Sequence, residues 1–148
     1  MKKINIAKVP VEKYASPGGK YAQRCQEISL AIGGRKHPFD LELVTLPAGK
    51  ANCPYHYHTA QWELYVIVRG TGQVRTPKGR TAVRTGDVFM CPPGEPHQLI
   101  NNTKRDLQYY CIADNPVSDS GYYPDSDKWL VDHWIIKGKR VPYLTGEE

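Results

Sequence analysis

The sequence contains no long apolar run: nowhere do 18 apolar residues follow one another. A helix that crosses a bilayer needs about 20 such residues, so no membrane partner is expected. Residues 1–7 are too short and too polar for a signal peptide, which leads us to expect a cytoplasmic protein. Hydrophobic residues make up 40% and charged residues 24% of the chain, a balance that excludes intrinsic disorder.

Cysteine is scarce and never occurs as C-x-x-C, which excludes a thioredoxin motif and argues against a cysteine-type zinc site. Because no export signal is recognised, we expect reduced thiols rather than disulfides. Most of these thiols are expected to be small buried apolar side chains rather than nucleophiles. The four residues are Cys25, Cys53, Cys91 and Cys111.

Clusters of positive charge are also missing, although the formal net charge is +5. The basic residues are scattered, and none lies on a recognisable helix or beside an RNA-binding signature. Net charge by itself governs solubility and nonspecific binding rather than function. We therefore expect no nucleic-acid partner.

Turn-forming residues are abundant: 13 glycines and 12 prolines are spread along the 148 residues. This spacing argues against a helix bundle and for short strands joined by turns. Residues 39–46 alternate between apolar and polar, and residues 71–75 and 80–84 flank a turn that predicts a hairpin. The pattern predicts an all-β sandwich or barrel. Further strands are expected at residues 26–32, 63–68, 87–91, 97–101, 107–113 and 129–137.

The length fits a single domain covering residues 1–148. The core of the predicted barrel spans about residues 26–113. Residues 114–128 are rich in Pro, Gly, Asp and Ser, which predicts a long loop that acts as a lid or an edge-covering strap. Residues 129–148 are predicted to form a late strand and a loosely held tail.

The positions of two histidines are typical of a metal-binding site. His56 and His58 are two residues apart on an extended segment, so both rings leave one face, and imidazole is the commonest metal ligand. The alternative interpretation is that the two histidines are half-exposed side chains at the edge of a sheet and bind no metal. Glu63 opens an otherwise apolar strand and needs a partner, which can be a metal or a surface Arg or Lys. Its odd offset from His58 requires the chain to turn between them.

Two groups of residues repeat a known spacing. The first group comprises Gly49, His56, His58, Glu63 and Gly70. The second group comprises Gly86, Pro92, Gly94, His97 and Asn101. Together they resemble the two sequence motifs of the cupin superfamily, although one additional residue separates the first glycine from the first histidine. The two motifs span residues 49–101.

This resemblance implies a cupin-type double-stranded β-helix, the jelly-roll barrel. It also implies that His56, His58, Glu63 and His97 bind one divalent transition metal, which can be Mn, Fe, Ni or Zn. Such a site leaves one or two coordination positions for water or a substrate oxygen, as a Lewis acid requires.

Stretches outside the motifs resemble small bacterial cupins of unassigned activity that are often labelled sugar-phosphate isomerase-like. The resemblance implies a small-molecule ligand or substrate. For a sugar phosphate, basic residues near the metal are needed, and Lys50, Arg69 and Arg75 are candidates. A fold does not fix a function, so this label remains an analogy.

Three functions fit these residues. The first is a metal-dependent enzyme, isomerase-like or dioxygenase-like, acting on a small oxygen-bearing molecule. The second is a non-catalytic module that binds a sugar or an anion and uses the metal for structure or recognition. The third is a metal-free barrel in which Glu63 or His97 acts as an acid–base group. Neither a separate catalytic residue nor a motif for an organic cofactor is evident.

Residues 62–68 are apolar on both faces of the predicted strand. A strand that is apolar on both faces is buried on both faces. We therefore expect one face to line the barrel and the other to be covered by a second subunit, which predicts a homodimer.

Overall fold

The computed structural model describes residues 1–34, 38–138 and 145, and the end of the predicted tail lies outside these ranges. Within these ranges it contains thirteen strands and two short helices, η1 (Ile6–Lys8) and α1 (Ile28–Gly33). The predicted all-β fold is confirmed. No helix within the described ranges is long and apolar enough to span a bilayer.

All ladders within the three sheets are antiparallel. The largest sheet has the order β1-β2-β3-β10-β5-β8. Its strands are β1 (Glu12–Ala15), β2 (Ala22–Glu27), β3 (Phe39–Leu46), β5 (Glu63–Arg69), β8 (Val88–Cys91) and β10 (Leu107–Asp114).

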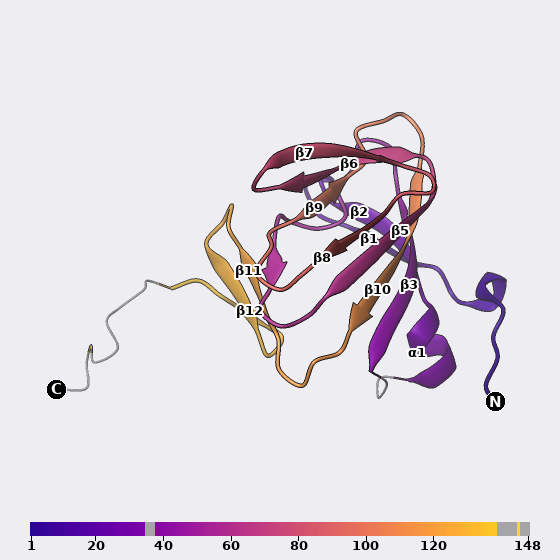
Figure 1. Ribbon diagram of the computed structural model, residues 1–148, viewed down its shortest axis with the longest axis horizontal. Coiled ribbons are helices and arrows are strands. Elements are labelled where there is room, and N and C mark those ends of the chain that lie inside the picture. The colour runs from indigo at the N-terminus through magenta and orange to yellow at the C-terminus, as the bar shows by residue number, and fades with distance from the viewer. Residues whose placement is uncertain (35–37, 139–144, 146–148) are drawn as a thin grey trace.

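Two smaller sheets complete the barrel wall (Figure 1). The order β7-β6-β9 comprises β6 (Thr71–Thr76), β7 (Gly79–Arg84) and β9 (Gln98–Ile100). The order β13-β12-β11-β4 comprises β4 (Tyr57–His58), β11 (Ser120–Tyr123), β12 (Lys128–Val131) and β13 (Trp134–Ile136). The hairpin of β11 and β12 stands on the left in Figure 1, on the opposite side from α1 and the N-terminus.

The core lies between the largest sheet and the β7-β6-β9 sheet. Val44, Tyr65 and Tyr109 from the first pack with Val74 and Leu99 from the second, and all five are buried. Burial alternates along β5 although both of its faces are apolar, because successive side chains leave opposite faces of a strand. The inner face of the sheet therefore faces a packed interior.

All four cysteines are free thiols, as predicted. Cys25 and Cys91 belong to the buried core, and Cys111 packs against it. Burial raises the pKa of the Cys53 thiol, with a further contribution from the negative charge of Glu63. Burial raises the pKa of Cys25 and Cys111 as well, so these three thiols are poor nucleophiles because the thiolate is disfavoured.

The predicted strand at residues 26–32 is wrong from residue 28 onward. β2 ends at Glu27 and the chain then forms α1, which packs against β3. Ile28 and Ser29 are buried there, and the Ser29 hydroxyl accepts a hydrogen bond from the Leu41 amide at 3.0 Å. A short apolar run fits either a strand or a helix, and the contact with β3 decides between them.

The predicted loop at residues 114–128 contains β11, and the predicted strand at residues 129–137 belongs to two strands, β12 and β13. The hairpin between them turns at Asp132 and His133, which both have positive φ. Composition was misleading because Gly121 lies within β11, where it pairs with His58. Glycine has a weak intrinsic preference for a strand, and the pairing with β4 stabilises the strand conformation.

Gly70, between β5 and β6, has φ +89°, and a Cβ atom there would lie 2.6 Å from the backbone oxygen of Asp106. We predict that Gly70→Ala lowers the free energy of unfolding by about 3 kcal/mol, from backbone strain and this clash. The matched control is Gly86→Ala, since Gly86 has φ +93° with no neighbouring atom within 4 Å. Strain alone predicts a loss of about 1 kcal/mol at that position. Equal losses in urea denaturation would show that the clash contributes nothing.

Candidate metal centre

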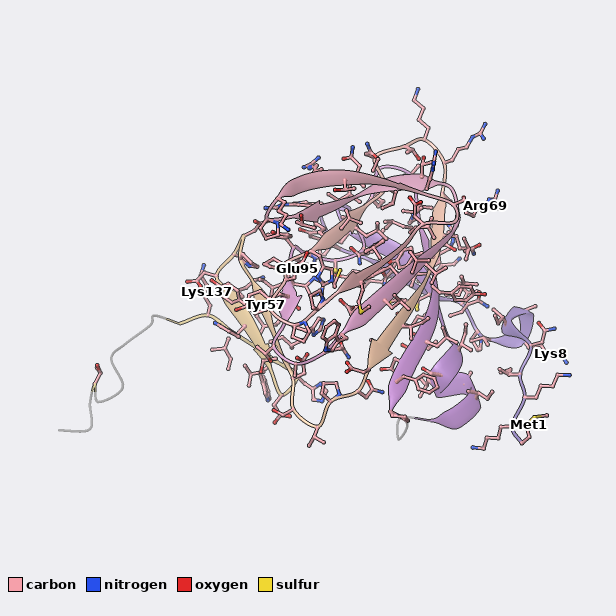
Figure 2. The ribbon with its side chains drawn as sticks, in the orientation of Figure 1. Met1, Lys8, Tyr57, Arg69, Glu95 and Lys137 are labelled. Atoms are coloured by element: carbon pink, nitrogen blue, oxygen red, sulfur yellow. The ribbon has the colours of Figure 1, made fainter. Side chains whose placement is uncertain are left out.

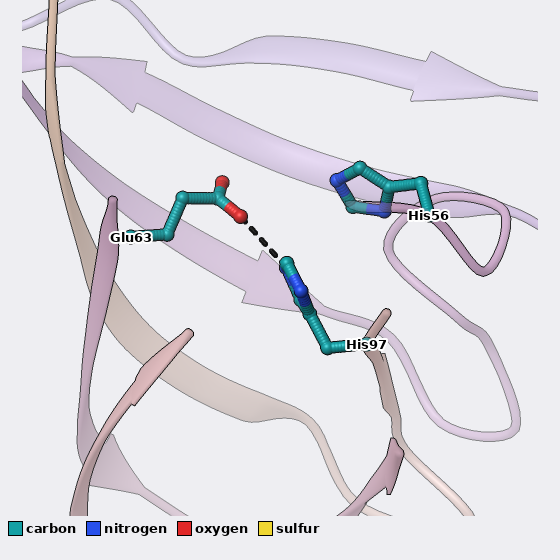
Figure 3. A group of neighbouring side chains, drawn as sticks. All are labelled: His56, Glu63 and His97. Atoms are coloured by element: carbon teal, nitrogen blue, oxygen red, sulfur yellow. Dashed lines mark hydrogen bonds and ion pairs between the residues drawn. The ribbon is translucent and has the colours of Figure 1, made fainter. Parts of the chain in front are cut away.

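Three of the four predicted ligands converge inside the barrel. His56, Glu63 and His97 place one potential ligand atom each within 4.8 Å of one another (Figure 3). His56 and His97 face each other across an isolated β-bridge, in which each backbone amide donates to the other carbonyl, at 3.2 and 2.8 Å. All three residues are buried, between 3% and 9% exposed. The backbone pairing therefore fixes the two imidazoles side by side.

Glu63 reaches the histidines because the chain turns between β4 and β5, as the sequence requires. The amides of Ala60 and Gln61 donate to Asp119 Oδ1, at 2.8 and 3.2 Å. The Trp62 amide donates to Asp114 Oδ1 at 2.8 Å. These bonds stabilise the turn that returns the carboxylate to the inner face.

The hydrogen bonds of the His56 and His97 imidazoles determine which ring nitrogen is available to bind a metal. His56 Nδ1 lies 3.0 Å from the carbonyl oxygen of Pro54, and His97 Nδ1 lies 3.0 Å from that of Glu95. A carbonyl oxygen only accepts, so both Nδ1 atoms carry a proton and both Nε2 atoms face the cluster. His97 Nε2 lies 2.7 Å from Glu63 Oε2.

His58, the fourth predicted ligand, lies beside this group. Its Nε2 is 3.8 Å from Glu63 Oε2, and its ring meets the ring of His56 edge-on, with centroids 5.1 Å apart. Its Nδ1 is 2.6 Å from the carboxylate of Asp119. Asp119 was not predicted, since it lies 61 residues from His58. The one local signal was the abundance of aspartate in residues 114–128.

The charges of the cluster are coupled. Burial, and then the neighbouring His97, lower the pKa of His56 to about 4. Burial also disfavours the charged form of His97, but its interactions with Cys91 and Glu63 outweigh burial and raise its pKa to about 10. Burial opposes the charge of Glu63 as well, yet the hydrogen bond from His97 keeps the pKa of Glu63 below its usual value. The result is a neutral imidazole beside an imidazolium–carboxylate pair.

This donor set fits a divalent transition metal. His56 and His97 offer Nε2 atoms fixed by their Nδ1 hydrogen bonds, and Glu63 offers a carboxylate. Imidazole and carboxylate ligands suit Zn, Fe, Ni and Mn, and a cation would take the place of the proton between His97 and Glu63. Hydrogen bonds that orient ligating imidazoles are a general feature of metal sites.

The cupin domain family matches residues 42–113, which carry His56, Glu63 and His97. The protein is a cupin. Its antiparallel all-β architecture is the cupin jelly-roll barrel that the resemblance implied. No curated protein matches the sequence.

Several solved structures share this cupin fold. A sugar phosphate isomerase of the cupin superfamily from Silicibacter pomeroyi, SPO2919, has a TM-score of 0.78 at 19% identity, covering 93% of this chain and 92% of that one. A predicted oxalate decarboxylase from Thermotoga maritima has a TM-score of 0.67 at 20% identity, covering 77% and 99%. The polyketide cyclase RemF from Streptomyces resistomycificus has a TM-score of 0.61 at 20% identity, covering 77% and 79%. Three different activities on one fold assign none of them to this cupin.

Of the three basic residues considered for a sugar phosphate, two bind other parts of the chain and the third lies at the far end of β5. Arg69 ends β5 at the opposite end from Glu63, far from Tyr57 and Glu95 in Figure 2. Arg75 binds Asp125 with two hydrogen bonds of 2.6 and 2.8 Å and lies over the Tyr55 ring. Lys50 Nζ donates to the carbonyl of Gly19 at 2.6 Å.

The stability of the metal-free cupin should peak near pH 6.5. Because folding lowers the pKa of His56 from 6.5 to about 4, stability is lost as pH falls through this range, by about 3 kcal/mol at full protonation. Because folding raises the pKa of His97 from 6.5 to about 10, its contribution is complete below 6.5 and is lost as pH rises. Urea denaturation in the presence of a chelator, repeated across the pH range, measures the loss of stability on the acid side and on the alkaline side, here called the acid and alkaline limbs. His56→Gln should flatten only the acid limb, and an unchanged acid limb would contradict the assignment.

Proposed function

We propose that this cupin is a cytoplasmic metal-dependent enzyme that acts on a small oxygen-bearing molecule. His56, His58, Glu63 and His97 are the proposed ligands of one divalent cation, Mn, Fe, Ni or Zn. One observation carries the proposal: each of the three histidines has its Nδ1 bound to an oxygen acceptor, so that Nε2 is left for the cluster. When bound, the cation would act as a Lewis acid that polarises a carbonyl or hydroxyl oxygen.

The residues around the cluster exclude water from one side. The Tyr65 hydroxyl is 3.5 Å from His97 Nε2, and the Tyr65 ring stacks on Phe89 with centroids 4.8 Å apart. On another side the Tyr123 ring stacks on His56, with centroids 6.0 Å apart. Electrostatic interactions are stronger in such a water-poor environment. The surroundings favour chemistry on a bound oxygen over simple surface recognition.

A non-catalytic sugar-binding or anion-binding cupin with a structural metal is the second candidate. The engagement of Lys50 and Arg75 in contacts within the chain weakens the case for turnover of a sugar phosphate and so favours this candidate with a neutral sugar as the ligand. A metal-free acid–base function is the third candidate, supported by the 2.7 Å contact between His97 Nε2 and Glu63 Oε2. Both predict a bound small molecule but differ in metal content and turnover.

A homodimer is proposed from the outer face of β3, β10, β5 and β8. Two rows of cross-strand neighbours there are apolar throughout: Leu41, Ile112, Leu64 and Met90 in one row, and Leu43, Tyr110, Val66 and Val88 in the other. Met90 and Val88 are 55% and 59% exposed. A contiguous apolar sheet face of this kind is suited to packing against another sheet. We propose that the same face of a second copy covers it.

The metal proposal predicts about one equivalent of bound metal after reconstitution of the untagged protein, measured by elemental analysis. His58→Ala should weaken metal binding at least about tenfold while the circular dichroism spectrum stays β-rich. His133→Ala is the matched control, because His133 is exposed in the turn after β12 and should leave metal binding unchanged.

Less than about a tenth of an equivalent in the reconstituted wild type would overturn both metal-dependent candidates, since imidazole-rich metal sites are ordinarily filled. If metal is present, a screen of sugar phosphates, diketones, thiols and oxalate-like acids, with oxygen uptake recorded, separates an enzyme from a binder. Turnover supports the first candidate, and tight binding without turnover supports the second.

The homodimer proposal predicts that Val88→Glu converts a dimer into a monomer in light scattering coupled to gel filtration. A charge in the centre of an apolar interface is strongly disfavoured once desolvated. Val117→Glu is the control, because Val117 is fully exposed and lies outside this face. A wild-type monomer, or a Val88→Glu dimer, contradicts the proposed interface.

A further inference from the structure

The carboxylate of Asp119 is the centre of a hydrogen-bond network that joins His58 to the turn between β4 and β5. Its Oδ2 atom lies 2.6 Å from His58 Nδ1. Its Oδ1 atom accepts hydrogen bonds from the amides of Ala60 and Gln61, at 2.8 and 3.2 Å, and from the Thr59 hydroxyl at 3.3 Å. One side chain therefore holds both the imidazole and the turn that leads to Glu63.

These contacts fix the state of the His58 ring. A carboxylate accepts hydrogen bonds only, so His58 Nδ1 carries the proton and Nε2 is the atom that faces Glu63. Without the carboxylate, the ring could take either tautomer and could rotate about its side-chain bonds. Metal-ligating imidazoles are ordinarily held by such an acceptor, and its loss typically weakens metal affinity 10–100-fold.

Asp119 also connects the ligand strand to the β11–β12 hairpin. Asp119 immediately precedes β11, which pairs with β4 through Gly121 and His58. Thr59 and Ser120 are joined by two further hydrogen bonds, of 2.8 Å between Thr59 N and Ser120 O and 2.9 Å between Ser120 N and Thr59 Oγ1. Farther along the same hairpin is Tyr123, whose ring stacks on the ligand His56.

We propose that Asp119 is a positioning residue of the metal centre, acting through His58, and that it links metal affinity to the docking of the β11–β12 hairpin. This inference rests on the proposed function, because it assumes that His58 is a ligand. If hairpin docking raises metal affinity, then bound metal must stabilise the docked hairpin by the same factor.

The test compares Asp119→Asn with a matched control, Asp125→Asn. Both aspartates belong to the same hairpin region, and each carboxylate forms a hydrogen bond of 2.6 Å, Asp119 with His58 and Asp125 with Arg75 on the surface. An asparagine at position 119 cannot serve every donor, because one of its two ends is an NH₂ group. If its oxygen keeps the amides of Ala60 and Gln61, its NH₂ group faces His58 Nδ1 and favours the other tautomer.

Three measurements are made on the full chain with Zn²⁺ or Co²⁺ as the probe. By competition with a chromophoric chelator, Asp119→Asn should bind 10–100-fold more weakly than wild type, and Asp125→Asn should match wild type. Imidazole ¹⁵N shifts of the metal-free protein at about pH 8, where most imidazoles are neutral, should show Nδ1–H at His58 in wild type and its loss in Asp119→Asn. Hydrogen exchange should show metal-dependent protection of residues 119–123 in wild type and less in Asp119→Asn.

The outcomes separate the two proposals. If wild type binds neither ion, the proposed function is overturned and this inference falls with it. If wild type binds metal and Asp119→Asn binds equally well, or if His58 in wild type carries its proton on Nε2, only this inference is overturned. An equal loss of affinity in Asp125→Asn would also overturn it, because the effect would then reflect general loosening of the hairpin.

Discussion

The structure depends on the burial of one carboxylate. Glu63 is 9% exposed, and an unpaired charge removed from water to that extent costs several kcal/mol. The compensation comes from His97, whose Nε2 lies 2.7 Å from Glu63 Oε2 and which the backbone bridge holds beside His56. The imidazoles gathered around Glu63 are also the nitrogen ligands that a cation would require, so one arrangement serves folding and the proposed chemistry.

The two faces of the largest sheet have different roles. Tyr65 and Ile67 point from β5 into the core, whereas Leu64 and Val66 point outward and belong to two rows of side chains that are apolar across four strands. A barrel with a polar outer face can leave that face in contact with water and needs no second subunit to cover it. Here the outer face gives the proposed dimer a surface on the side of the sheet opposite the candidate metal centre, so that assembly and chemistry can be tested by separate variants.

The hairpin after β10 shows how a surface element can complete an interior site. β11 adds to the short strand β4 and carries Asp119 to His58 and Tyr123 to His56. The polar contacts orient His58, and the aromatic contact covers His56, both of which are proposed ligands. The candidate centre is therefore built from the motif residues inside the barrel together with a segment that lies outside both motifs.

The sequence alone determined the strands from β3 to β10, because alternation and turn residues are local properties. The resemblance to the cupin motifs implied that His56, His58, Glu63 and His97 form one site. The sequence did not determine α1, β11 or the division of residues 129–137 into β12 and β13, since an apolar run such as residues 28–33 fits two structures and the residues around Gly121 are typical of a turn. Only the tertiary structure selected between them, through contacts with β3 and β4. The partnership of His58 with Asp119 was likewise settled in three dimensions, because a hydrogen bond between residues 61 positions apart has no local signature.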